Sequence, residues 1–129
     1  NLAKQIQKME SKKTIVLGAS TNPSRYSNMA VKKLLNFGHE VIPVGIKNGK
    51  IENLEIVPAI EVIQEVDTIT LYLGPQNQPE YYDYVEAVNP KRVIFNPGTI
   101  NIDFMERLRR KGIVVEDACT LVMLSAGTY

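Results

Sequence analysis

Residues 14–37, TIVLGASTNPSRYSNMAVKKLLNF, carry the strongest structural signal in this chain. The first four, Thr14–Leu17, form an apolar, β-branched run that is typical of a strand buried on both faces. Gly18 ends the run, and a loop rich in Ser, Thr, Asn and Pro follows it. Ser27 stands just before a segment with apolar residues at helical spacing, so we expect it to cap a helix. A strand, a glycine-led loop and a helix in this order predict the first unit of a nucleotide-binding α/β fold.

The polar loop is suited to bind a phosphate group. The free N–H groups and the positive dipole end of the following helix favour anions, and Arg25 can add a bidentate contact. Gly18 is the only glycine of the loop, so the loop has neither the G-x-G-x-x-G nor the G-x-x-x-x-G-K-[ST] pattern. Its polar groups come instead from Ser20, Ser24, Arg25 and Ser27.

The rest of the chain alternates between strand and helix patterns. The further expected strands are Glu40–Val44, Thr68–Leu73, Arg92–Phe95 and Ile113–Val115. The further expected helices are a short one over 59–66, one that begins near Pro79, one capped by Asn101, and a last turn or two around 121–124. This alternation predicts the α/β class with a doubly wound, Rossmann-like sheet of five parallel strands. Right-handed crossovers with the first strand in the centre lead us to expect the strand order 3-2-1-4-5.

In such a sheet the ligand crevice lies beyond the carboxyl ends of the strands, at the point where the strand order reverses. The expected order puts that point between the first and fourth strands. Four loops should meet there: Gly18–Ser27, Gly45–Lys47, Gly74–Gln76 and Asn96–Gly98. All four contain glycine, and this agreement supports the crevice better than any single loop does.

Composition narrows the functional classes. The 129 residues should form one domain over 13–129, preceded by a polar tail over 1–12. Fifteen Lys and Arg against 14 Asp and Glu leave almost no net charge, which argues against a nucleic-acid or membrane-surface partner. The single Cys can form neither an internal disulfide nor a cysteine zinc site, and no apolar run approaches the ~20 residues that span a bilayer. No signal peptide is visible, so we expect a cytoplasmic protein.

The second strand bears on which nucleotide could bind. NAD-binding domains usually end this strand with an acid that holds the ribose, but here the end reads PVGIK, residues 43–47, with no acid. Lys47 and Lys50 would suit a phosphorylated ribose, such as the 3′-phosphate of coenzyme A (CoA) or the 2′-phosphate of NADP. Each lysine can equally be a solvated loop residue.

The first loop resembles that of small single-domain CoA-binding proteins, relatives of the CoA-binding domain in the succinyl-CoA synthetase α subunit. Gly18-Ala19-Ser20, Asn22-Pro23-Ser24-Arg25 and Ser27 match that pattern, and the resemblance extends more loosely over about 13–124. It implies CoA or an acyl-CoA as ligand. It implies diphosphate contacts by Ala19, Ser20, Arg25 and Asn28, beside Gly18 and Ser27 of the same loop. It also implies adenosine contacts at Val44, Gly45 and Lys47, and cleft walls at Leu73, Gly74, Asn96, Pro97 and Gly98.

The sequence departs from this family at two places. Many members carry an aromatic-Arg pair after the third strand, where this chain has Leu73-Gly74. Many also carry Trp-x-Gln-x-Gly on the fourth strand, where this chain has Phe95-Asn96-Pro97-Gly98. Asn96 could partly replace that Gln as a hydrogen-bonding amide.

Catalytic groups are scarce in the sequence. Cys119 has no obvious base, since the one histidine, His39, lies far away in sequence, and a small buried residue is the simpler interpretation. The histidine that becomes phosphorylated in the synthetase subunit lies in a separate domain, so the resemblance implies binding and not ligation. We expect a CoA-binding module with no catalytic residue and no metal site. The alternatives are an NADP-binding oxidoreductase domain, with Tyr72, Tyr81 or Tyr82 as proton donor, and an interaction module with an empty cleft.

Overall fold

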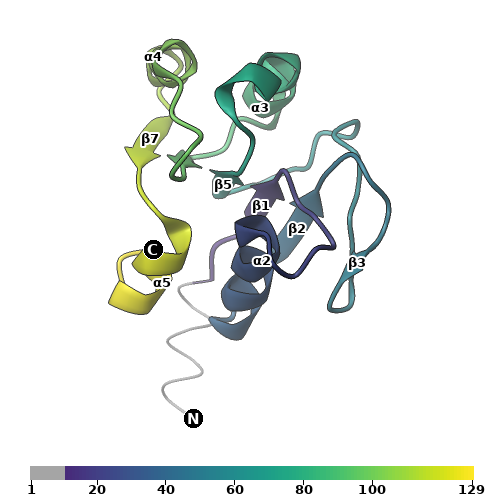
Figure 1. Ribbon diagram of the computed structural model, residues 1–129. Helices are drawn as coiled ribbons and strands as arrows, with labels where there is room; N and C mark the ends of the chain where they lie inside the picture. The colour runs from purple at the N-terminus through teal and green to yellow at the C-terminus, as the bar shows by residue number, and fades with distance from the viewer. Residues whose placement is uncertain (1–10) are drawn as a thin grey trace.

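The computed structural model describes residues 11–129, which form a five-stranded parallel sheet with helices on both faces (Figure 1). The strands of this sheet are β1 (Thr14–Leu17), β2 (Val41–Val44), β5 (Thr68–Leu71), β6 (Arg92–Phe95) and β7 (Val114–Asp117). The helices are α2 (Tyr26–Asn36), α3 (Tyr82–Val88), α4 (Ile102–Arg110) and α5 (Thr120–Ala126), with 3-10 turns η1 (Pro75–Asn77) and η2 (Pro79–Tyr81) before α3. Helices α2 and α5 lie on one face of the sheet, and α3 and α4 lie on the other. Of the predicted tail, residues 1–10 lie outside the described part of the chain.

The predicted α/β class and five-stranded parallel sheet are confirmed, and α5 matches the expected last helical turns. Strands β1 and β5 are buried along their whole length, as their apolar, β-branched sequences require. The apolar faces of α3 and α4 pack on one side of the sheet around Phe95, Phe104 and Leu108, all nearly inaccessible to solvent. No helix within residues 11–129 is both long and apolar enough to cross a membrane.

The strand order differs from the expected one. The sheet runs β2-β1-β5-β6-β7, so the third strand along the chain pairs with β1 and not with β2. Pro43 in β2 explains why: its carbonyl accepts a hydrogen bond from the Val57 N–H (3.0 Å) on the outer side of β2, and its nitrogen has no hydrogen to donate there. A proline of this kind belongs on an edge strand, and β2 is one. The strand order therefore reverses between β1 and β5.

The predicted helix over 59–66 is wrong. The segment consists of turns and bends, and the connection from β2 to β5 instead contains a two-stranded hairpin of β3 (Lys50–Ile51) and β4 (Leu54–Glu55). Ile60 is 77% exposed and Val62 is 41% exposed, so the apolar spacing there does not mark a buried helix face. The many β-branched residues of the segment also disfavour a helix.

Candidate functional site

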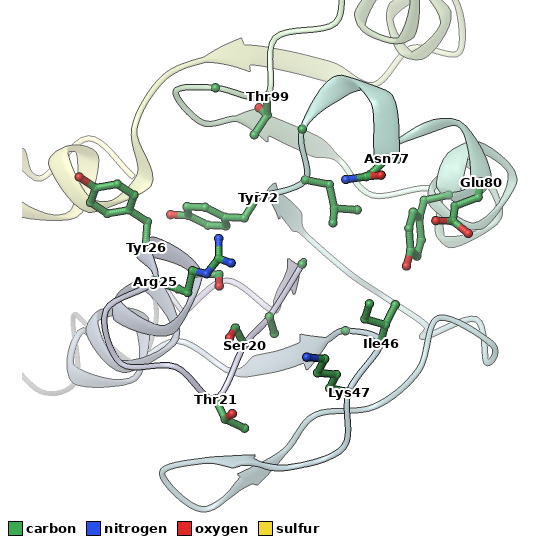
Figure 2. Close-up of a pocket in the computed structure, with 18 of the residues that line it drawn as sticks. Ser20, Thr21, Arg25, Tyr26, Ile46, Lys47, Tyr72, Asn77, Glu80 and Thr99 are labelled. Atoms are coloured by element: carbon green, nitrogen blue, oxygen red, sulfur yellow. The ribbon is translucent and has the colours of Figure 1, made fainter.

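A cleft of about 600 Å3 opens at the carboxyl ends of the parallel strands, where all four predicted loops meet (Figure 2). It lies over the reversal point between β1 and β5, which is where ligands bind in open α/β sheets. Most of the predicted site residues line it: Gly18, Ala19, Ser20, Arg25, Ser27, Gly45, Lys47, Leu73, Gly74, Pro97 and Gly98.

Three of the predicted site residues do not line the cleft: Asn28, Val44 and Asn96. Val44 is fully buried, and its carbonyl accepts hydrogen bonds from the N–H groups of Gly18 and Ala19, both at 2.9 Å. Val44 thus holds the start of the first loop against the end of β2.

Asn96 is a structural residue of the interior. Its Nδ2 donates to Thr70 Oγ1 (2.7 Å) and to the Leu71 carbonyl (2.9 Å), and its Oδ1 accepts from the Thr120 N–H (2.9 Å). It is 1% exposed. The amide that was expected to face the cleft is used instead to join β5, β6 and the start of α5.

Helix α2 begins at the cleft with unsatisfied backbone donors. Arg25 occupies the N-cap position without a side-chain capping bond, so the prediction that Ser27 caps the helix is wrong. Ser27 lies in the first turn and is buried, and it lines the cleft. Among residues 11–129, the N–H groups of Tyr26, Ser27 and Asn28 have no hydrogen-bond partner. Such a helix start presents donors and a positive dipole end to an anion.

The loop before this helix is held by its own side chains. Asn22 Oδ1 accepts from the N–H (3.0 Å) and from Oγ (2.8 Å) of Ser24, and Ser20 Oγ accepts from the Asn22 N–H (3.1 Å). Ser20 therefore still has its hydroxyl hydrogen to donate. The Ser24 hydroxyl is directed into the loop, and Ser24 does not line the cleft.

Two glycines let the loops approach one another closely. Gly18 has φ +95°, a conformation that side chains disfavour, and it follows β1 directly. A Cβ at Gly45 would lie 2.5 Å from the Ala19 carbonyl oxygen. The loop after β2 can therefore pack against the loop after β1 only because residue 45 has no side chain.

The charges of the cleft are local and mostly basic. Arg25 and Lys47 line it, are exposed, and take part in none of the ion pairs found in the described residues. In Figure 2 the Lys47 ammonium points toward Ser20, and the Arg25 guanidinium points toward the ring of Tyr72. Glu80 is the one acid that lines the cleft. Lys50, the other lysine expected to favour a phosphorylated ribose, lies outside the cleft.

The sequence did not single out eight further lining residues: Thr21, Tyr26 and Ile46, which lie within the predicted loops, and Tyr72, Asn77, Glu80, Tyr81 and Thr99, which lie outside them. Asn77, Glu80 and Tyr81 come from the 3-10 turns after β5, which fold back over the cleft. Ile46 is 84% exposed and lies between two predicted site residues. An apolar residue in a polar loop at this place in the sequence indicates a contact with a ligand. Of these residues, Tyr72 and Tyr81 figure in the sequence-based hypotheses only as proton donors of the NADP alternative.

Two tyrosines of the cleft, Tyr72 and Tyr81, have hydroxyl pKa values above the ordinary value. Burial raises the pKa of the Tyr72 hydroxyl well above its ordinary value. Burial and, second, the charge of Glu80 raise the pKa of Tyr81. Neither Cys119 nor His39 lines the cleft, and no group of three or more His, Cys, Asp or Glu in the described part of the chain could hold a metal ion. The lining offers hydrogen-bonding groups and two cations that attract an anion.

Comparisons with known proteins identify a family that this chain matches and solved structures of the same fold. Residues 12–125 match the family described as CoA binding domain. A crystal structure of an uncharacterized protein is 50% identical, with a TM-score of 0.91 over 92% of this chain and 98% of that one. A conserved hypothetical protein from Pyrococcus furiosus is 28% identical, with a TM-score of 0.73 over 81% of this chain and 91% of that one.

A hypothetical protein from Pyrococcus horikoshii OT3 shows the same fold, with a TM-score of 0.83 at 23% identity over 96% of this chain and 88% of that one. A comparison with curated proteins gave no match. The family match spans nearly all of the described residues and includes every loop of the cleft. The chain therefore belongs to the CoA-binding domain family.

Proposed function

We propose that this chain binds CoA or an acyl-CoA in the cleft between the loops after β1, β2, β5 and β6, without a catalytic step of its own. The observation that carries the proposal is the start of α2: its first three N–H groups have no partner among the described residues, and Arg25, Tyr26 and Ser27 line the cleft. The diphosphate of CoA carries the negative charge that such a site attracts.

The lining residues fit the other parts of CoA as well. Ala19, Ser20 and the first turn of α2 would hold the diphosphate together with Arg25. Lys47 would pair with the 3′-phosphate on the ribose, because it is exposed in the cleft and has no acidic partner among the described residues. The walls would come from the loops after β5 and β6, at Leu73, Gly74, Pro97 and Gly98.

The absence of catalysis and a cytoplasmic location belong to this proposal. Among the described residues, the lining of the cleft has tyrosines, an acid and two cations but no Cys or His.

Isothermal titration calorimetry with CoA, acetyl-CoA, NAD and NADP tests the proposal. We expect at least one CoA form to bind more tightly than either dinucleotide. Tighter binding of NAD or NADP than of any CoA form would overturn it. Native mass spectrometry of the purified protein adds a second test, since a ligand retained through purification shows its mass directly.

The NADP alternative rests on Lys47 alone, because a 2′-phosphate would suit this lysine as well as a 3′-phosphate does. Titration of NADPH while its fluorescence is followed separates the two ligands. A saturable change with a lower Kd than that of CoA would favour the oxidoreductase reading, and no change would dismiss it.

A further inference from the structure

Asn28 is a buried polar residue at the start of α2, and its side chain reaches the loop of the cleft. It is the third residue of the helix and is 2% exposed. Its Nδ2 donates a hydrogen bond of 2.9 Å to the carbonyl oxygen of Ser20. It does not line the cleft, whereas Ser20 does.

The rest of the Asn28 amide is poorly satisfied. Its Oδ1 is buried and has no hydrogen-bond partner among residues 11–129. A buried acceptor without a partner lowers the stability of a fold, and an apolar side chain would avoid that cost. Any benefit of the Asn28 side chain must therefore come from the hydrogen bond that its Nδ2 donates. The acceptor of this bond, the Ser20 carbonyl oxygen, belongs to the loop of the cleft.

The bond to Ser20 fixes the loop where an anion would lie. A carbonyl oxygen that accepts from Asn28 is engaged and cannot turn toward a phosphate, which it would repel. The same bond ties the loop to the first turn of α2, whose N–H groups of Tyr26 and Ser27 have no partner among the described residues. The donors of the loop and those of the helix start are thereby held in one arrangement.

We propose that the Asn28 side chain is a positioning group for the anion site: it acts through the Ser20 carbonyl and does not contact the ligand, whereas the backbone N–H of Asn28 has no partner among the described residues. This inference rests on the proposed function and replaces the direct diphosphate contact that the family resemblance implies for Asn28. It predicts that the loop of the free protein depends on Asn28, whereas a residue that only contacts the ligand would leave the free loop unchanged.

Three variants test the inference. Asn28→Ala removes the donor. Asn28→Asp keeps the shape but replaces the donor by a carboxylate that repels the Ser20 carbonyl, unless the carboxyl is protonated. Asn36→Asp is the matched control, because Asn36 ends the same helix, is exposed and lies outside the cleft. CoA affinity is measured by calorimetry from pH 5 to 8, with a thermal melt of each variant.

We expect Asn28→Ala to raise the Kd for CoA about tenfold at every pH. This is the size of effect that the loss of one hydrogen bond in the site would have. Asn28→Asp should bind most weakly at pH 8 and recover at pH 5, because a protonated carboxyl again offers a donor to Ser20 and burial disfavours its charged form. The CoA affinity of Asn36→Asp should equal that of the wild type at each pH from 5 to 8. Any pH dependence that these two proteins share then comes from the titration of CoA itself and not from residue 28.

Hydrogen exchange of the free proteins gives a readout that needs no ligand and no titration. Asn28→Ala should exchange faster than the wild type in the loop of residues 20–25, with the sheet unchanged. Equal exchange in that loop, or CoA affinity equal to that of the wild type, would overturn the positioning role and leave the proposed function in place. A wild-type protein that binds no CoA would overturn both.

Discussion

Arg25 shows how a binding site and a stable helix make different demands on one residue. Ser, Thr, Asp or Asn at the N-cap would satisfy a first-turn N–H group, but Arg25 stands there and makes no capping bond. The N–H groups of Ser27 and Asn28 stay free of partners in the described structure as a result. An anion at the cleft would satisfy these groups and pair with the guanidinium at the same time, so under the proposed function the helix start would gain its partners when the ligand binds.

Replacing Arg25 by Ala should therefore weaken CoA binding without weakening the fold. Hydrogen bonds to charged groups contribute about 1.5–3 kcal/mol, so we expect the Kd for CoA to rise about tenfold to a hundredfold. The side chain is exposed, so the free energy of unfolding should change by no more than about 0.5 kcal/mol. Arg25→Lys should recover part of the affinity, because a point charge cannot form a bidentate contact.

Calorimetry and melting curves of both variants check this prediction. Arg109→Ala is the control, since Arg109 is an exposed arginine of α4 outside the cleft. Equal CoA affinity of the wild type and Arg25→Ala would remove the phosphate role from this loop.

His39 should make stability depend on pH at the opposite end of the sheet. Burial, and next the charges of Lys12 and Arg92, lower its pKa, against a smaller raising effect of Asp67. Its Nδ1 accepts a hydrogen bond from the Lys12 N–H (3.0 Å), which requires the unprotonated nitrogen, and its ring packs 4.9 Å from that of Tyr129.

The sign of the pH effect follows from the lowered pKa. Well above pH 6.5 the histidine is uncharged in both the folded and the unfolded chain, so its lowered pKa has no effect on stability there. Below the unfolded pKa, near 6.5, the unfolded chain binds a proton that the folded chain resists, so stability falls as the pH drops through the folded pKa. Denaturant unfolding of the wild type and His39→Asn from pH 8 to 5 should show a steeper loss for the wild type. Parallel curves would refute this role of His39.

At the scale of the elements, the sequence predicted what depends on local pattern. Apolar, β-branched runs marked the five sheet strands to within two residues at each end, and the glycines after them marked the loops of the cleft. The expected order puts the third strand beside β2, whereas Pro43 makes β2 an edge strand and the third strand pairs with β1.

Other features of the cleft depend on contacts between distant residues. Asn77 and Glu80 line it because the turns after β5 fold back, and no spacing in the sequence encodes that placement. Asn96 was expected in the cleft because it follows a strand, yet its partners Thr70 and Thr120 draw its amide into the interior. Residue type and position therefore located the loops, but not which side chains of those loops line the cleft.

Asn96→Ala tests how far the elements depend on one buried amide. The substitution leaves the Leu71 carbonyl and the Thr120 N–H without their partner in the interior, between β5 and α5. An unsatisfied buried group costs about 1–3 kcal/mol, so we expect the free energy of unfolding to fall by at least about 2 kcal/mol. Urea unfolding measures it, with the exposed Asn36→Ala as control. A loss no larger than that of Asn36→Ala would show that the network does not hold α5 to the sheet.

At the scale of the whole molecule, the cleft joins segments that are far apart in the chain. Its lining residues come from 18–27, 45–47, 72–81 and 97–99, which lie at one edge of the sheet. The molecule is almost neutral, with a formal charge of +1, so the attraction for an anion comes from Arg25, Lys47 and the start of α2 and not from the general charge. A ligand in the cleft would contact loops after four of the five strands of the sheet and would thereby oppose unfolding of the domain as a whole.

CoA should accordingly raise the melting temperature of the entire domain in one transition. A ligand at a hundred times its Kd stabilises the folded state by about 2.7 kcal/mol, which corresponds to a rise of roughly 10 °C for a domain of this size. At the same CoA concentration the rise should be smaller for Arg25→Ala, because its Kd is larger. Pantetheine, which lacks the phosphate groups, should give almost no rise. Differential scanning calorimetry measures all three, and a rise with pantetheine equal to that with CoA would show that the phosphates, and with them the start of α2, do not contribute to binding.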